Sequence, residues 1–403
     1  MEAYFLEWIN LFVRWFHVIA GIAWIGASFY FVWLDNSLKN PPQSKQDKGI
    51  AGDLWAIHGG GFYEVAKYKL GPEKMPEQLH WFKWEAYTTW LTGMVLLWVV
   101  YYVGAESFLI DNRKLALSSW QATALGLGFI CAGFVVYEAL VKSPLRHKNG
   151  LFGLVLFGFL TFLSWLADQL FSDRGAYIHV GAVIGTIMAG NVFFGIMPAQ
   201  RALVDAVQRG EAPDPRYGAF AKLRSTHNNY LTLPLIFIMI SNHYPMTYAH
   251  QHGWAVLAGI IFIAGLTRHF FNLRHRGQSK PIILIASTLM LFALAGIMAH
   301  TDATLEPSGN NVISNEQAMH IVSKRCTTCH AAQPTQAGFE TAGAQAGITL
   351  EDLKTVIAMK QKLLEVTQSG YMPLANMTQM TAQERQQLVD WLAAQSHQKT
   401  KTN

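Results

Sequence analysis

The chain carries little charge and almost no cysteine. Only 14% of its 403 residues are charged, whereas a soluble domain usually carries about 25%. The shortage is concentrated in the first three quarters, which predicts two different parts rather than one uniform soluble fold. Three cysteines exclude a disulfide scaffold, and for the lone Cys131 we expect a small buried side chain. The modest net charge of +5 does not suggest nucleic acid as a partner.

Long apolar runs are abundant instead. A helix needs about 20 mainly apolar residues to cross a bilayer. Eight runs approach or exceed this length, at 8–33, 84–103, 117–140, 151–171, 177–200, 229–247, 253–272 and 281–300. The first is longer than the apolar core of a signal peptide and has no basic segment before it, so we expect no cleaved leader. The sequence therefore predicts an all-α fold, an eight-helix transmembrane bundle in the lipid bilayer with both termini on one side.

Basic residues are distributed unevenly between the two sets of loops. Lysines and arginines gather in the segments 39–83, 142–148, 201–224 and 274–280, all on one predicted side. The opposite loops hold only Arg113, Lys114 and Arg174. Because basic loops stay in the cytoplasm, we expect the first set to be cytoplasmic. Both termini would then be periplasmic, in a multi-pass protein of the bacterial inner membrane.

The last quarter has a different composition. A polar segment with Pro and Gly at 301–314 predicts a linker after the membrane domain, residues 1–300. The remainder, 315–403, is predicted to be a small soluble domain. Ser314 with Gln317, and Thr381 with Glu384, are each typical of a capping box that opens a helix. The last helix is amphipathic, with Leu388, Trp391 and Leu392 on one face.

This small domain contains the clearest motif of the chain, Cys326-Thr327-Thr328-Cys329-His330. C-x-x-C-H is the attachment signature of c-type haem. The thiols of Cys326 and Cys329 add to the porphyrin vinyl groups, and His330 follows as the first axial ligand of the iron. A zinc site or a redox C-x-x-C is the alternative, but this domain has no other cysteine. We therefore expect one covalent haem c.

The second axial ligand is expected from the stretch SGYMPLANMTQMT, residues 369–381. Met372 is followed by a proline, which favours an extended loop, and Y-M-P-x-x-N before a final helix resembles class I cytochrome c. We predict that Met372 completes the iron coordination with His330, and that Met377 and Met380 pack against the ring or the core. Methionine ligation raises the potential, so this haem would accept electrons readily.

Two histidines lie in similar apolar surroundings in the membrane domain. His17 in WFHVIAGIAWIGASFYF and His179 in YIHVGAVIGTIMAGNVFF align with several identical neighbours. Their spacing suggests two four-helix halves related as a parallel repeat. The nearby small residues permit either close helix approach or room for a flat ligand. The histidines either hydrogen-bond between helices, or bind a haem b or a flat substrate.

The first long loop is dense in titratable groups. The segments LWAI, HGGG and FYEVAKYKL predict a strand, a turn and a strand, with His58 at the turn. His80 and Lys83 lie just before Glu85, which falls inside an apolar span. A carboxylate there needs a partner, and His80, Lys83 or His227 would serve.

The mouth of the predicted sixth span adds hydrogen-bond donors. Arg224, His227 and Asn228 lie close together in STHNNYL and the residues before it. With the loop residues they would bind a flat, anionic molecule at the cytoplasmic end of the bundle. Ionisable groups in spans are functional candidates by default.

The stretch HGGGFYEVAKYKLGPEKMPEQLHWFKWEAYTTWLTG, together with eight spans and a terminal C-T-T-C-H domain, resembles the bacterial membrane-bound urate hydroxylases, also described as cytochrome c urate oxidases. The resemblance covers essentially the whole chain. It implies oxidation of urate to 5-hydroxyisourate, with electrons leaving through the fused cytochrome and no peroxide made. The acceptor would be a soluble or membrane cytochrome c, or a terminal oxidase.

The resemblance assigns the haem residues but not the urate site. We expect Glu85, His80 or His227 to act as the general base. Substrate contacts are expected from Lys83, Arg224, Asn228 and His58, while His17 and His179 would hold the second haem if one is present.

Two other classes of protein remain open from the sequence. One is a quinol-oxidising membrane cytochrome, and the other is a redox-sensing transporter. A quinol enzyme would reduce its haem with a quinol analogue and ignore urate, and a transporter would move solute without a redox change.

Overall fold

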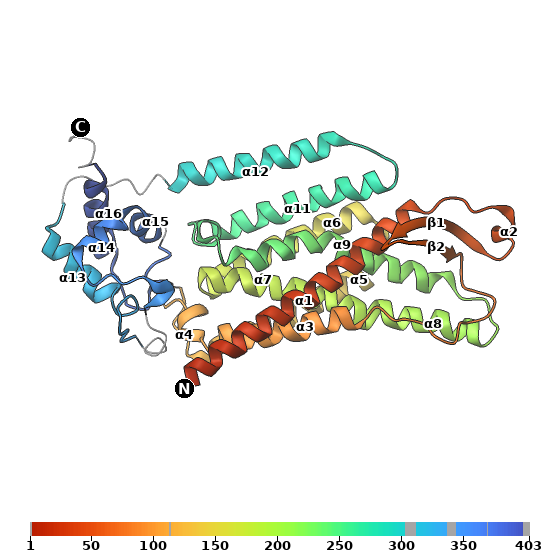
Figure 1. Ribbon diagram of the computed structural model, residues 1–403, viewed down its shortest axis with the longest axis horizontal. Helices are drawn as coiled ribbons and strands as arrows, with labels where there is room; N and C mark the ends of the chain where they lie inside the picture. The colour runs from red at the N-terminus through yellow and green to blue at the C-terminus, as the bar shows by residue number, and fades with distance from the viewer. Residues whose placement is uncertain (1, 113, 303–311, 337–343, 369, 398–403) are drawn as a thin grey trace.

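The computed structural model describes residues 2–112, 114–302, 312–336, 344–368 and 370–397. Arg113 and most of the predicted linker lie outside the described residues. A long helical bundle forms the body of the molecule, with a small helical domain at one end and a β-hairpin at the other (Figure 1). The first helix begins at the end that carries the small domain.

The membrane domain is helical apart from the hairpin. Its helices are α1 (Glu2–Ser37), α2 (Gln43–Gln46), α3 (Trp84–Leu97), α4 (Ala105–Phe108), α5 (Ser119–Lys142), α6 (Asn149–Leu170), α7 (Asp173–Gly190), α8 (Met197–Gln208), α9 (Pro215–Ser241), α10 (Pro245–Tyr248), α11 (Gly253–His275) and α12 (Pro281–Asp302). A π-helical turn extends α3 (η1, Trp98–Tyr102) and another joins α7 to α8 (η3, Asn191–Ile196). A short 3-10 helix (η2, Pro144–His147) links α5 to α6.

Six of the described helices are long and apolar enough to cross a membrane, so the chain is a multi-pass membrane protein. They are Trp8–Ser37, Ser119–Lys142, Asn149–Leu170, Asp173–Gln208, Gly253–His275 and Pro281–Ala299. The predicted count of eight is approximate. The second predicted span is α3 with its π turn. The sixth begins in α9, whose first turns carry Arg216, Lys222 and Arg224, and ends in α10. Both run along the bundle beside the other helices (Figure 1).

Helix α7 lies at the centre of the bundle and packs against α3, α5, α6, α9 and α11. Its side chains Val180, Val183, Ile184 and Ile187 are fully buried. A Cβ atom on Gly181 would lie 2.6 Å from Cγ2 of Ile238 on α9. The small residues around His179 therefore allow close helix packing, as predicted. By contrast, α12 lies at the edge and packs on α11.

Cys131 is exposed on α5, so the prediction that it is buried was wrong. Helix α5 is one of the candidate membrane spans. A small apolar thiol on its outer face would meet lipid, which is as apolar as a protein core.

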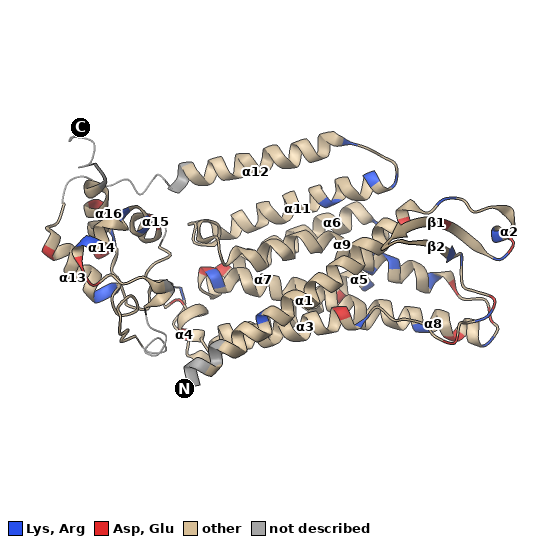
Figure 2. Ribbon diagram, viewed as in Figure 1, with Lys and Arg blue, Asp and Glu red and all other residues tan. Residues whose placement is uncertain are grey.

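The hairpin agrees with the prediction. Strands β1 (Ile50–His58) and β2 (Gly61–Tyr68) pair antiparallel, and His58 lies opposite Gly61. Gly59 and Gly60 form the turn with φ angles of +58° and +82°, which side chains other than glycine rarely adopt. Lysines and arginines gather at this hairpin end of the molecule and over α8 and α9 (Figure 2).

The C-terminal domain is built from α13 (Asn315–Arg325), α14 (Leu353–Ala358), α15 (Lys360–Gln368) and α16 (Ala382–His397), with the 3-10 turns η4 (Gln345–Gly347) and η5 (Leu374–Asn376). Both predicted capping boxes are present, Ser314 with Gln317 and Thr381 with Glu384. Leu388, Trp391 and Leu392 are buried on the predicted face of α16. The fold is thus all-α, a membrane helical bundle followed by a small helical domain.

Candidate functional site

The C-x-x-C-H motif begins where α13 ends. Cys326 caps the helix, and neither it nor Cys329 forms a disulfide. Burial raises the pKa of Cys326 to about 12, and burial also raises the pKa of Cys329. A redox-active C-x-x-C pair needs a lowered thiol pKa. Among the described residues no group of three or more His, Cys, Asp or Glu is placed to hold a metal ion.

His330 and Met372 are both fixed by neighbouring groups. His330 Nδ1 lies 3.2 Å from the carbonyl oxygen of Ile348, and donation there leaves Nε2 for an axial bond. The Met372 amide donates to Val366 O over 2.9 Å, and its carbonyl accepts from Arg385 Nη1 over 2.6 Å. Met380 is buried in the core of this domain. Two free thiols, an oriented imidazole and an anchored methionine loop fit a covalent haem c.

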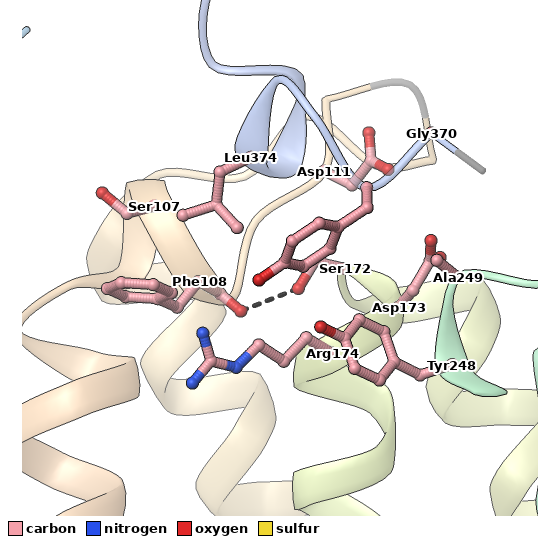
Figure 3. Close-up of a pocket in the computed structure, with 11 residues that line it drawn as sticks. Ser107, Phe108, Asp111, Ser172, Asp173, Arg174, Tyr248, Ala249, Gly370 and Leu374 are labelled. Atoms are coloured by element: carbon pink, nitrogen blue, oxygen red, sulfur yellow. Dashed lines mark hydrogen bonds between the residues drawn. The ribbon is translucent and has the colours of Figure 1, made fainter. Parts of the chain in front are cut away.

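The domain carrying the motif contacts the membrane domain directly. Tyr371, next to Met372, lies 6.2 Å from the ring of Tyr248, and Tyr248 lies 6.0 Å from the ring of Tyr177 on α7. In Figure 3, Phe108, Arg174 and Tyr248 face the Gly370–Leu374 segment. The space between them is small, about 30 Å³. The haem domain is therefore packed against this end of the bundle.

A much larger cleft lies toward the hairpin end. Its volume is about 880 Å³, within the range of roughly 300–1,000 Å³ typical of ligand sites. Residues of α1, α8 and α9 form its walls, and it reaches inward along α1 to Gly21, one helical turn from His17. Two sets of polar residues line the cleft. One consists of amide and hydroxyl side chains on α9 and α11: Ser225, Thr226, Asn228, Asn229, Thr232 and Asn272. The other consists of charged residues toward the hairpin: Asp35, Lys67, Lys69, Lys222 and Arg276.

The structure brings together only some of the predicted catalytic residues. His80 lines the cleft, and its Nε2 lies 3.9 Å from Oε1 of Glu85 in the first turn of α3. Oε2 of Glu85 is buried without a hydrogen-bond partner. His227 lies on the other side of α9, where it stacks on Phe152 with ring centroids 4.5 Å apart. His80 and Glu85 therefore form a pair beside the cleft, and His227 does not join it.

Of the four predicted substrate residues, only Asn228 lines the cleft. Asn228 lines the cleft and donates to Met188 O over 2.9 Å. Arg224 is fully buried and forms a two-pronged ion pair with Glu138, with a further bond of 3.0 Å to Asn191. His58 is exposed at the end of β1, and Lys83 lies over the ring of Trp84, 5.8 Å from its centroid. Neither His58 nor Lys83 lines the cleft.

The two intramembrane histidines are held by protein groups. His179 is fully buried, with Nδ1 2.9 Å from Gly175 O and Nε2 3.2 Å from the hydroxyl of Tyr102. His17 Nδ1 lies 2.9 Å from the hydroxyl of Thr92. The interpretation of His179 as an interhelical hydrogen-bonding residue fits this geometry. A haem b between these histidines is unsupported, because both ring nitrogens of His179 already have partners.

Several polar residues in the same region were missed by the sequence analysis. Asn191, in the π turn η3, joins the hydroxyl of Tyr137 to Asn228 and Arg224. Asn229 and Asn272 line the cleft. A single π turn within a helix is frequent at functional sites, but nothing in the local sequence marks it. Two adjacent asparagines in STHNNYL, at the start of an apolar span, could have marked Asn229 as a candidate site residue.

These features define a membrane-bound electron-transfer oxidoreductase, a helical membrane domain with a ligand-sized cleft fused to a c-type cytochrome. Residues 3–299 match the urate oxidase N-terminal family, and the chain belongs to that family. Residues 317–396 match the cytochrome c family. No curated protein and no solved structure matched the chain.

Proposed function

We propose that the membrane domain oxidises urate to 5-hydroxyisourate and passes the electrons to the fused haem c. The observation that carries this proposal is the cleft of about 880 Å³, lined by amides and hydroxyls within a domain of the urate oxidase family. Lys67 and Lys222 share the single carboxylate of Asp35, and with Lys69 they leave an excess of positive charge toward the hairpin end that would attract an anion. The polar groups along α9 suit a planar purine rich in carbonyl and N–H groups.

The reaction must release two electrons. Urate and water give 5-hydroxyisourate, two protons and two electrons, and water forms the new C–O bond at C5. We propose that Glu85, with His80 beside it, accepts a proton as the electrons leave. The unpartnered Oε2 of Glu85 and the 3.9 Å separation from His80 support this role.

The fused haem supplies one-electron acceptance. Cys326 and Cys329 would attach it, and His330 and Met372 would be its axial ligands. Because a single haem takes one electron at a time, each urate requires two transfers. The contact of Tyr248 with Tyr371 supports this end of the bundle as the exit for electrons.

We further propose that the domains are residues 1–300 and 315–403, joined by the linker 301–314. The crowding of lysine and arginine at the hairpin end favours a cytoplasmic hairpin and periplasmic termini in the bacterial inner membrane (Figure 2). Electrons would then pass from haem c to a cytochrome c or a terminal oxidase of the respiratory chain.

Anaerobic reduction of the haem tests this function. Urate added to the purified, oxidised chain should bring up the spectrum of reduced c-type haem, and the product should be 5-hydroxyisourate. A reduced quinol analogue, added separately, should act poorly. If dithionite reduces the haem and urate does not, the proposed function is wrong. Reduction by the quinol analogue but not by urate would identify a quinol-oxidising cytochrome.

A further inference from the structure

Two amide atoms in the wall of the cleft have no protein partner. Asn229 is 2% exposed, and its Nδ2 is buried without a hydrogen bond. Oδ1 of Asn272, on the neighbouring helix α11, is buried and unpartnered as well. Burying a polar atom without a hydrogen-bond partner destabilises the folded chain, because the atom loses its bonds to water. One free donor and one free acceptor therefore lie in the wall of a ligand-sized space.

The other atoms of these amides are held in place. Oδ1 of Asn229 accepts from Nε of Arg268 over 2.9 Å and from Nδ2 of Asn272 over 2.9 Å. These bonds fix which end of each amide remains free. The free donor of Asn229 and the free acceptor of Asn272 are thus preorganised.

Arg268 adds a positive charge behind this pair. It is 5% exposed, and its guanidinium lies 4.1 Å from the centroid of the Phe29 ring. Among the described residues Tyr230 is a titratable group that acts on the charge of Arg268, and no carboxylate does so. A buried cation without a counter-ion favours an anion nearby, and its bond to Oδ1 polarises the Asn229 amide toward stronger donation.

The nearby Arg224 shows the opposite arrangement. It is fully buried as well, but both oxygens of Glu138 neutralise it. Arg224 on α9 is therefore closed by its ion pair, whereas Arg268 on α11 lies behind an open pair of amides, Asn229 on α9 and Asn272 on α11. Asn229 and Asn272 line the cleft, whereas Arg224 does not.

We infer that Asn229, Asn272 and Arg268 form the subsite that recognises the amide edge of an anionic purine. Nδ2 of Asn229 donates to a ring carbonyl, Oδ1 of Asn272 accepts from the adjacent ring N–H, and Arg268 acts through Asn229 on the anionic charge. This inference rests on the proposed function and makes these residues determinants of specificity rather than of the chemical step.

The variant Asn229→Asp tests the subsite with the least change in shape. It keeps an oxygen for Arg268 and Asn272 but replaces the free donor by an acceptor. Binding of labelled urate is measured by equilibrium dialysis on the full chain, with the haem kept reduced by dithionite so that no turnover occurs. We expect binding at least about tenfold weaker, since a donor to a charged ligand is lost. Asn149→Asp, an exposed change at the start of α6, is the matched control and should bind urate normally.

Asn272→Ala provides a second variant in case Asn229→Asp does not fold, which elution profile and haem content will show. It should weaken urate binding as well. Unchanged urate binding in a folded Asn229→Asp or Asn272→Ala protein would overturn the inference, as would a wild-type chain that does not bind urate. A wild-type chain that binds urate through Asn229 but does not reduce its haem would leave the subsite standing and refute the proposed oxidation.

Discussion

The two ends of the membrane domain differ in how their polar side chains are paired. At the haem end Arg174 donates to the hydroxyl of Tyr101 over 3.1 Å and to Asn242 over 3.0 Å, and Lys114 pairs with Asp173 over 2.6 Å. At the hairpin end a cleft of about 880 Å³ is lined by Asn229 and Asn272, each of which has one buried amide atom without a hydrogen-bond partner. An end that only passes electrons needs close contact, whereas an end that binds substrate needs empty volume and unpaired groups.

The largest expected effect comes from the cysteines of the haem motif, whose replacement should abolish haem reduction and leave urate binding intact. Replacing both Cys326 and Cys329 by serine removes the covalent attachment, so haem reduction by urate should fall to background. Urate binding in the cleft should remain as in wild type, since these residues lie in the other domain. Absorbance and dialysis measure the two properties, and loss of urate binding in a folded, haem-free protein would show that the ends are not separable.

Tyr371 tests whether the contact between the domains carries electrons. Tyr371→Leu removes the ring that lies 6.2 Å from Tyr248, and we expect a several-fold slower reduction of the haem by urate in stopped-flow absorbance. Tyr371→Phe keeps the ring and should react near the wild-type rate. Reduction by dithionite is the control for an intact haem, and equal rates with urate for the Leu and Phe variants would argue against this route.

The residues of the haem site can be predicted from the sequence, whereas most residues of the cleft cannot. The haem site is local, because Cys326, Cys329 and His330 adjoin one another and Met372 lies in a recognisable loop. The hairpin, both capping boxes and the bundle follow from local patterns in the same way. The cleft is assembled from α1, α8, α9 and α11, so its composition depends on how the helices pack. Sequence analysis therefore found Asn228 and His80 but missed Asn229, Asn272 and Arg268, and it grouped His227 with residues on the other side of α9.

The smallest expected effect concerns the acid stability of the haem domain. Partial burial alone raises the pKa of Glu384, but hydrogen bonds from Arg325 and Thr381 outweigh it and hold the pKa below its ordinary value of 4.5. The unfolded domain therefore takes up this proton at a higher pH than the folded one. The ionised Glu384 therefore stabilises the folded haem domain fully above about pH 4.5. This contribution is lost as the pH falls through the lower pKa of Glu384 in the folded domain.

Glu384→Gln tests this assignment in the full chain. The variant should lose part of the decline in stability below about pH 4.5, measured as the pH dependence of thermal loss of the haem spectrum. Glu365→Gln, an exposed change on α15 beside Lys362, is the matched control and should retain the wild-type profile. Because the cleft lies at the other end of the molecule, urate binding should be the same in both variants at neutral pH. An acid profile for Glu384→Gln that coincides with that of the control would show that the Arg325 pair does not set the lower limit of stability.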